Sequence, residues 1–345
     1  MVKILEFGKI KTGEMVNKYI ITNANGSYVE IIDYGCKICK IVVPNKNKEL
    51  VNVCLGYDTL DEYVDDGCFL GTAVGRYANR IANGKFTING VEYKVDLNED
   101  GVNNLHGGYK NFSNCVWKLD EKGDDFVKFT KKFVDMEGGF PGNITAYITY
   151  QWSDSNELLI SYEATTDKDT VINMTNHSYF NLSGDYTKEI LDHEVIIYTD
   201  KYTPVNEKCI PLDGVESVIG TPFDFTTRHK IGERIDCDNE QLRIGKGYDH
   251  NYAFDNLDDK LMAEVFCEES GISLKCYSCE PGIQLYTGNN LVMLNKDEDK
   301  FKLRTGLCLE TQKYPDSPNN DKFPSALVKA FEKYSSYTKY EFGVE

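Results

Sequence analysis

Short segments of alternating apolar and polar residues recur along the chain, and they constrain its fold more than any other feature. Each segment is rich in β-branched or aromatic residues and ends at Gly, Asn or Asp after roughly ten residues. The clearest examples are residues 28–32, 85–95, 144–152, 158–164 and 307–312. Alternation with a period of two is typical of strands that bury one face. The pattern therefore predicts an all-β protein.

The turn-forming residues between these segments predict how the strands connect. Asn89 and Gly90 stand between Ile88 and Val91, and a type I′ hairpin turn needs two residues that tolerate positive φ. No long stretch keeps a 3.6-residue period, so helices should be few and short, with residues 325–334 the best candidate. No repeat or linker divides the chain. We expect one domain, residues 1–345, built as a large antiparallel β-sandwich of two big sheets packed face to face.

Composition and charge exclude several classes of function. With 345 residues, 41% of them hydrophobic, the chain can bury a sizeable core and is too apolar for disorder. The formal charge of −17 repels phosphate backbones and anionic lipid headgroups, so neither nucleic acid nor a membrane is an expected partner. No secretory leader or membrane-length apolar run is visible, and eleven cysteines, an odd number, suit reduced thiols. These features predict a cytoplasmic protein.

Two Cys-x-x-Cys pairs raise the possibility of a zinc site. Cys36 and Cys39 form one pair, and Cys276 and Cys279 form the other. The pairs are much farther apart than in a zinc ribbon, and both lie in strand-like segments, where positions three apart point to opposite faces. We therefore expect no metal.

The segment around His177 is a candidate for chemistry. Strand alternation places five polar side chains on one face: Asn173, Thr175, His177, Tyr179 and Asn181. The other face carries mostly apolar residues. A polar face of this kind suits a groove that binds a ligand with many hydroxyls, and a solvated sheet surface is the alternative.

A second segment, residues 306–319, presents a carboxylate beside apolar neighbours. Leu307 and Leu309 point one way, and Cys308 and Glu310 point the other way. A carboxylate near the protein interior is costly unless it is paired or used, so Glu310 is a candidate general base. An ordinary surface glutamate is the alternative.

Arginines are few in this chain, and two of them stand close together in residues 75–81, at Arg76 and Arg80. A guanidinium offers a planar fork of donors, which suits vicinal hydroxyls or carboxylates better than an ammonium does. A structural ion pair explains an isolated arginine equally well.

In this order, six segments of the chain resemble the aldose 1-epimerase, or galactose mutarotase, family. They are residues 75–86, 104–108, 175–184, 248–252, 281–289 and 309–312, and they spread over most of the chain. One such motif would be weak, but six in sequence are specific. The resemblance implies a galactose mutarotase-like β-supersandwich, a soluble enzyme with no metal or organic cofactor, and free hexoses such as galactose and glucose as substrates.

The resemblance also assigns roles to individual residues. It makes His177 the proton donor and Glu310 the proton acceptor. The residues that it places against the sugar are Asn79, Arg80, His106, Tyr179, Asp249 and Gln284. Arg80 is preferred over Arg76 because its spacing to His106 fits the family better.

Two positions depart from the family's pattern. Tyr77 replaces a small aliphatic residue, and Cys308 is an unusual residue before the catalytic glutamate. Neither change removes a reactive group, although they bear on sugar preference.

The implied roles lead to an expectation about pH. His177 must be an imidazolium to donate a proton, and we expect anionic surroundings to raise its pKa above ~6.5. A bell-shaped pH profile follows, because Glu310 must be ionised at the same time.

Three other functions compete with this interpretation. A hexose-6-phosphate 1-epimerase would need an Arg and Lys cluster, which the low Arg content disfavours. A glycoside hydrolase would need two carboxylates, for which Glu310 and Asp249 could serve, but His177 would then be unexplained. A non-catalytic carbohydrate-binding protein would not need both His177 and Glu310.

Overall fold

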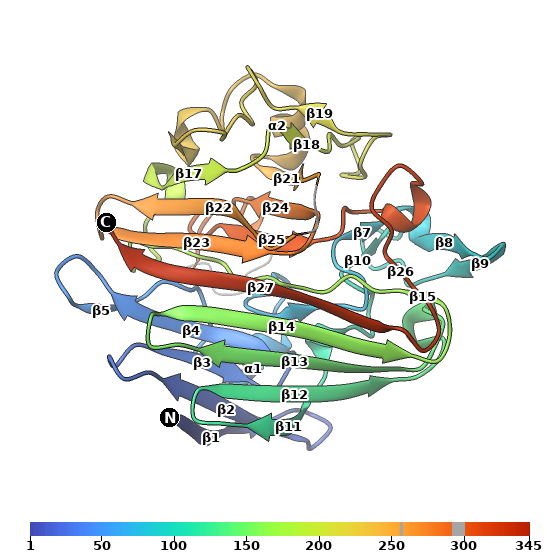
Figure 1. Ribbon diagram of the computed structural model, residues 1–345, viewed down its shortest axis with the longest axis horizontal. Helices are drawn as coiled ribbons and strands as arrows, with labels where there is room; N and C mark the ends of the chain where they lie inside the picture. Colours follow the sequence, from blue (N-terminus) through green and yellow to red (C-terminus); the bar gives the residue numbers. More distant parts are fainter. Residues whose placement is uncertain (256–257, 292–300) are drawn as a thin grey trace.

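The computed structural model describes residues 1–255, 258–291 and 301–345, and most of its regular structure consists of antiparallel strands (Figure 1). The largest sheet has nine strands and runs across the front of the view in Figure 1. In spatial order they are β11 (Lys118–Lys122), β12 (Phe126–Phe133), β13 (Ile144–Trp152), β14 (Glu157–Thr166), β27 (Lys333–Val344), β23 (Ile272–Ser278), β22 (Lys260–Cys267), β17 (Glu194–Ile197) and β20 (His229–Lys230).

Two five-stranded sheets complete the main framework. The first contains β1 (Val2–Lys9), β2 (Met15–Thr22), β3 (Tyr28–Ile32), β4 (Lys37–Pro44) and β5 (Leu50–Asn52). The second contains β19 (Glu216–Ser217), β18 (Lys201–Tyr202), β21 (Asp249–Ala253), β24 (Gly282–Tyr286) and β25 (Cys308–Gln312). The all-β sandwich is confirmed, but the expectation of two big sheets is too simple, because two separate five-stranded sheets accompany the nine-stranded one.

Short pairs of strands and a few short helices complete the regular structure of the described residues. The pairs are β7 (Arg80–Ile81) with β10 (Asn104–Leu105), β6 (Ala73–Val74) with β16 (Thr175–Asn176), β15 (Thr170–Val171) with β26 (Leu327–Val328), and β8 (Lys85–Ile88) with β9 (Val91–Lys94). The α-helices are α1 (Leu60–Val64) and α2 (Glu240–Gly245). The 3-10 turns are η1 (Ala82–Gly84), η2 (Phe112–Asn114), η3 (Glu137–Gly139), η4 (Ile190–Asp192), η5 (Ile231–Glu233) and η6 (Ser317–Asn319). Within the described residues, no helix has the length and apolar character needed to cross a membrane.

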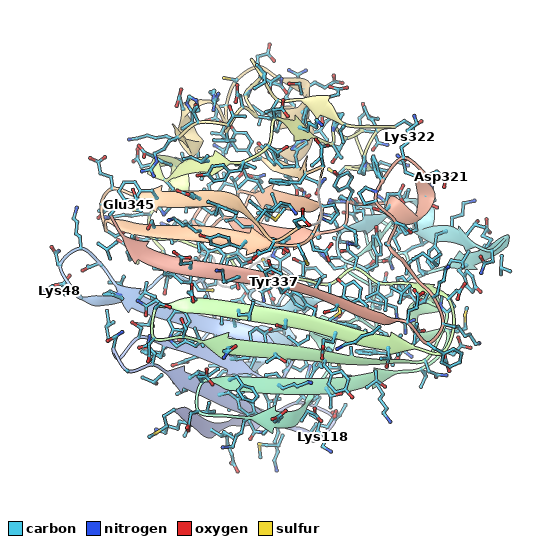
Figure 2. All side chains as sticks on the ribbon, in the orientation of Figure 1. Lys48, Lys118, Asp321, Lys322, Tyr337 and Glu345 are labelled. Carbon is cyan, nitrogen blue, oxygen red and sulfur yellow. The ribbon has the colours of Figure 1, made fainter. Side chains whose placement is uncertain are left out.

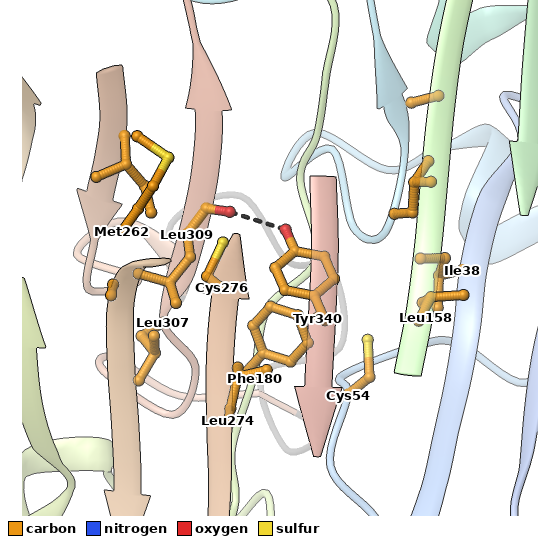
Figure 3. Close-up of a cluster of buried hydrophobic side chains, with 14 of the residues drawn as sticks. Ile38, Cys54, Leu158, Phe180, Met262, Leu274, Cys276, Leu307, Leu309 and Tyr340 are labelled. Carbon is orange, nitrogen blue, oxygen red and sulfur yellow. Dashed lines mark hydrogen bonds between the residues drawn. The ribbon is translucent and has the colours of Figure 1, made fainter. Parts of the chain in front are cut away.

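The three large sheets share one hydrophobic core. Its buried members include Ile31 of β3, Ile148 of β13 and Ile283 of β24. Figure 3 shows a part of this core, in which Leu309 of β25 lies beside Tyr340 of β27. The Tyr340 hydroxyl donates a hydrogen bond of 2.8 Å to the Leu309 carbonyl, so the core also holds the backbone of β25. Charged side chains such as Lys48, Lys118 and Lys322 are exposed (Figure 2).

The hairpin prediction is confirmed, and the helix prediction is wrong. Asn89 and Gly90 have φ values of 50° and 81°, as the turn between β8 and β9 requires. Residues 325–334 instead form β26 and the start of β27, because Val328 pairs with Thr170 and the Tyr334 ring is buried in the core. The true helices begin at side-chain caps, Thr59 for α1 and Asn239 for α2.

Candidate active site

Three neighbouring strands present a polar face on which two of the predicted site residues lie side by side. β24 pairs antiparallel with β21 and with β25, so Gln284 stands directly between Asn251 and Glu310. In the next row, Tyr286 stands between Asp249 and Cys308. Residues on the opposite face of β25 point into the core, as Leu309 does. The alternation predicted for this strand is therefore present.

This face closes one side of a cavity of about 360 Å³, a volume within the range of small-molecule sites. Segments far apart in the sequence complete its walls. Of the predicted site residues, those that line it are Asn79, Arg80, His106, His177, Tyr179, Asp249 and Glu310. Gln284 stands behind this lining. Its amide donates a hydrogen bond of 2.7 Å to Asp249 and so orients that carboxylate.

His177 and Glu310 meet in this cavity. The Nε2 atom of His177 lies 3.7 Å from the Oε1 atom of Glu310, and the two side chains are 7% and 3% exposed. The alternative of a surface glutamate is thus wrong. The second carboxylate oxygen of Glu310, Oε2, is buried without a hydrogen-bond partner in the described part of the protein. A buried polar atom of this kind is costly unless a ligand or water satisfies it.

Backbone pairing sets the orientation of His106. Its amide donates to the Asn79 carbonyl, and its Nδ1 atom accepts a hydrogen bond of 3.2 Å from the Asn79 amide. A neutral ring that accepts at Nδ1 carries its proton on Nε2. Both residues have left-handed backbones, with φ of 63° at Asn79 and 52° at His106. Strained conformations of this kind cluster at functional sites.

Arg80 is held at both its backbone and its side chain. Its guanidinium forms a fork with Glu99, with Nη2–Oε1 at 2.8 Å and Nε–Oε1 at 2.9 Å. Its carbonyl accepts a hydrogen bond of 2.8 Å from the amide of Asp316, which lies in the loop after β25. Although burial opposes the charge, Asp249 and Glu99 raise the pKa of Arg80. Arg80 therefore stays cationic in the cavity wall.

Burial dominates the protonation of the central pair. It lowers the pKa of His177 to about 4, and the nearby Lys37 ammonium acts in the same direction. Burial also raises the pKa of Glu310 well above its usual value, with a further increase from the Asp249 charge and a decrease from Arg80. The expectation of a raised imidazole pKa is therefore wrong. Desolvation disfavours both charged forms, so the neutral pair, with its proton on the carboxyl group, is favoured over the charged pair.

Several polar residues near the site have structural roles. The Arg76 guanidinium is buried away from the cavity and donates to the carbonyl of Pro141 at 2.7 Å. The Tyr77 ring is also buried outside the cavity, where its hydroxyl donates to the Tyr314 carbonyl and accepts from the Ser317 amide. Tyr77 thus links the arginine segment to the loop after β25 and does not line the cavity.

The predicted polar face around His177 is only partly a binding surface. All five of its side chains are buried, so the alternative of a solvated sheet face is wrong. His177 and Tyr179 line the cavity, but Asn181 donates to the carbonyls of Lys188 and Thr305. Only Thr175 and Asn176 form a strand here, because the remaining segment bridges several sheets.

The structure adds cavity residues that sequence reasoning missed. Phe69 has a left-handed backbone with φ of 58°. The centroid of its ring lies 4.7 Å from that of the His106 ring and 6.2 Å from that of the His177 ring, on which it stacks. Lys246 and Glu99 also line the cavity. In the sequence, Phe69 lies between Gly67 and Gly71, just before the arginine segment, and this position could have marked it as a candidate binding residue.

Three side chains of the cavity, His106, His177 and Glu310, lie close enough together to raise the question of a metal site. Ligand atoms of His106, His177 and Glu310 lie within 4.8 Å of one another, a spacing that could hold an ion. However, Nδ1 of His106 accepts the Asn79 amide, so Nε2 carries the proton and is not free as a ligand. The geometry of His106 suits a donor to a hydroxyl group better than a metal ligand.

The chain is similar to known proteins in both sequence and fold. The profile of the family described as Aldose 1-epimerase matches residues 17–341. The chain is 35% identical over 341 residues to the galactose mutarotase of Rattus norvegicus, covering 98% of this chain and 97% of that protein. It is 36% identical over 338 residues to the aldose 1-epimerase of Escherichia coli K12, covering 96% and 97%. A solved aldose epimerase homologue from C. elegans superposes with a TM-score of 0.86 at 27% identity, covering 94% and 98% of the two chains.

Proposed function

The chain belongs to the aldose 1-epimerase family and is therefore an isomerase that acts on sugars, and we propose that His177 and Glu310 are its catalytic pair. By acting together, these two residues interconvert the α and β anomers of free hexoses such as galactose and glucose. The observation that carries this proposal is the 3.7 Å approach of the His177 Nε2 atom to a buried Glu310 carboxylate inside a polar cavity.

Anomer interconversion requires only proton transfers at two oxygens. The ring opens when a base removes the proton of the C1 hydroxyl and an acid delivers a proton to the ring oxygen. Rotation about C1–C2 then presents the other face of the aldehyde, and the reverse transfers close the ring. In our proposal Glu310 is the base and His177 is the acid. Each positioned group of this kind typically contributes about 10²- to 10⁴-fold.

The shifted pKa values of the pair suit this exchange. The starting state, Glu310 carboxylate with His177 imidazolium, holds the same number of protons as neutral Glu310 with neutral His177. Ring opening converts the first state into the second through the sugar. Because burial disfavours both charges, the imidazolium is a strong acid and the carboxylate a strong base, so both transfers favour ring opening from the charged pair. On closure the same two transfers run in reverse and restore the charged pair.

The remaining cavity residues are proposed to hold the sugar while it is open. Asp249 and Glu99 offer acceptors, and Arg80 and His106 offer donors to the ring hydroxyls. Asn79 and Tyr179 line the same wall, and Gln284 orients Asp249. Multiple contacts keep the aldehyde in place during rotation.

The charges around the cavity argue against a phosphorylated substrate. Among the described residues that line it, the cations are Arg80 and Lys246, and the acidic residues are Glu99, Asp100, Asp249 and Glu310. Arg80 is already engaged by Glu99. A phosphate would therefore meet an excess of negative charge. A neutral aldose is the better fit.

The direct test is polarimetry with freshly dissolved α-galactose. We expect the protein to accelerate the decay of optical rotation to the equilibrium mixture, and to do so for glucose as well. Rates across galactose, glucose, xylose and arabinose would rank the substrates. A protein that binds galactose, as shown by calorimetry, without accelerating the decay would be a carbohydrate-binding protein and would contradict the proposal.

The pH profile of kcat/KM is expected to be a broad bell. Below a pH of about 4, His177 takes up a proton while Glu310 remains protonated, so the pair holds one proton too many. Above the raised pKa of Glu310, the pair loses the proton that it must exchange. Polarimetric rates, corrected for the spontaneous reaction at each pH, should thus show an acid limb well below pH 6.5. An acid limb near pH 6.5 would contradict this account, in which the pair shares one proton. Each limb reports the titration of the pair as a whole and not of a single residue.

Phe69 is expected to bind the sugar through its ring. The C–H groups of a pyranose face are apolar, and burial of about 40 Å² of apolar surface against an aromatic ring contributes about 1 kcal/mol. Phe69→Ala should therefore raise KM about fivefold with a smaller change in kcat. Phe331→Ala is the matched control, because Phe331 also has a left-handed backbone, with φ of 66°, but is 86% exposed. Equal KM values for the two variants would contradict the assignment.

We also propose that residues 1–345 act as one domain in the cytoplasm. The largest buried cluster includes side chains from Tyr19 to Phe342, which supports a single folding unit. All eleven cysteines lie among the described residues and are unpaired, which supports a reducing compartment.

A further inference from the structure

Both ring nitrogens of His177 face side chains of the same strand. Nε2 lies 3.7 Å from Oε1 of Glu310, and Nδ1 lies 3.5 Å from Sγ of Cys308. Cys308 and Glu310 are two residues apart on β25, so their side chains point to the same face about 7 Å apart. That spacing accommodates an imidazole ring between them. β25 therefore contacts the ring at both of its titratable atoms.

We propose that Cys308 is a positioning residue whose sulfur accepts a hydrogen bond from Nδ1–H of His177. This contact leaves Nε2 as the nitrogen that gains and loses the catalytic proton. The inference rests on the proposed role of His177 as the proton donor. A neutral imidazole with its proton on Nδ1 is the form that remains after Nε2 has delivered its proton to the ring oxygen.

A thiol suits this position because it orients the ring without adding charge. Burial raises the pKa of Cys308 well above its usual value, so the side chain stays a neutral thiol. A carboxylate at the same place would stabilise the imidazolium and weaken His177 as an acid. Sulfur is a weak acceptor, so it selects the tautomer and leaves the acidity of the ring high.

The backbone around Cys308 is fixed on both sides. The amide and carbonyl of Leu307 exchange hydrogen bonds of 3.0 and 2.7 Å with Phe180, which is close in sequence to His177. The Leu309 carbonyl accepts from Tyr340 (Figure 3). Cys308 itself is 0% exposed. The sulfur thus has little freedom to leave Nδ1, as a positioning role requires.

Nitrogen NMR of the unmodified protein tests the tautomer directly. In protein labelled with ¹⁵N at histidine, we expect the neutral His177 ring to show a protonated Nδ1 and an unprotonated Nε2. The His177→Asn variant identifies the signals, because they are absent from its spectrum. A neutral ring with its proton on Nε2 would overturn the proposal, whatever the activity of the enzyme.

Kinetics of three cysteine variants test the consequence. Cys308→Ala should lower kcat about tenfold with KM changed less than twofold, and Cys308→Ser should recover most of that loss because its hydroxyl also accepts. Cys276→Ala is the control, since Cys276 is equally buried, at 0% exposure, in the core (Figure 3). Equal kcat for Cys308→Ala and Cys276→Ala would overturn the proposal. If Cys308→Ala does not fold, Cys308→Ser and the NMR experiment still test the proposal. Loss of activity in Cys308→Ser would overturn the proposal, and so would a neutral His177 ring with its proton on Nε2. Wild-type turnover by His177→Asn would instead refute the proposed function.

Discussion

Replacing Glu310 with glutamine is expected to lower kcat about 10³-fold while the fold stays intact. Glutamine keeps the size and polarity of the side chain but cannot remove the proton of the C1 hydroxyl, and a positioned base contributes about 10²- to 10⁴-fold. Because burial raises the pKa of Glu310, the neutral amide replaces a group whose neutral form is already favoured at this buried position. The variant should therefore unfold in urea at or above the wild-type midpoint.

His177→Asn and the double variant complete this experiment. His177→Asn should lower kcat by a similar factor, and the double variant should be little slower than either single variant, because the two groups work as one unit. Glu268→Gln, which changes an exposed carboxylate, is the control and should keep the wild-type rate. Near wild-type turnover by Glu310→Gln or His177→Asn would show that the assigned roles are wrong.

Asn173→Ala is expected to lower the free energy of unfolding by about 3 kcal/mol or more. The buried Asn173 amide donates to the carbonyls of Ala78 and Lys313 at 3.2 and 3.3 Å and accepts from the Lys313 amide at 2.8 Å. The truncation leaves buried backbone groups unpaired, each at a cost of about 1–3 kcal/mol. Asn173 joins the segment of Arg80 to the strand of Glu310, so kcat should also fall, by about tenfold.

Urea unfolding and polarimetry of the same samples would check both effects. Asn25→Ala is the matched control, because the exposed Asn25 amide donates to Asp154 at 2.8 Å. We expect the control to change stability by less than about 1 kcal/mol. An Asn173→Ala protein as stable as the control would refute the proposed brace between the two segments.

The sequence predicted the local geometry of the strands well. Alternation around Glu310 separated Leu307 and Leu309 from Cys308 and Glu310, and the structure places the leucines in the core. The Asn89–Gly90 turn was equally clear. Both depend on the backbone geometry of a few neighbouring residues, which is a local property of the chain.

Predictions that depended on distant partners were less successful. Residues 325–334 carry a weak helical pattern, but pairing of Val328 with Thr170 makes them strand. Tyr77 stands beside the predicted sugar-binding residues, yet its hydroxyl bonds to the loop after β25. The pairing energy of remote segments outweighs weak local preferences.

By itself, the sequence determined the all-β class, the faces of the strands and, through its six motifs, the family. These features follow from side-chain periodicity and from residue identity, and neither needs coordinates. The tertiary structure decided that Nε2 of His177 lies 3.7 Å from Glu310, that Phe69 reaches both cavity histidines, and that Cys308 faces Nδ1. It also reversed the expected direction of the pKa shift of His177, because that shift depends on burial by segments remote in the sequence.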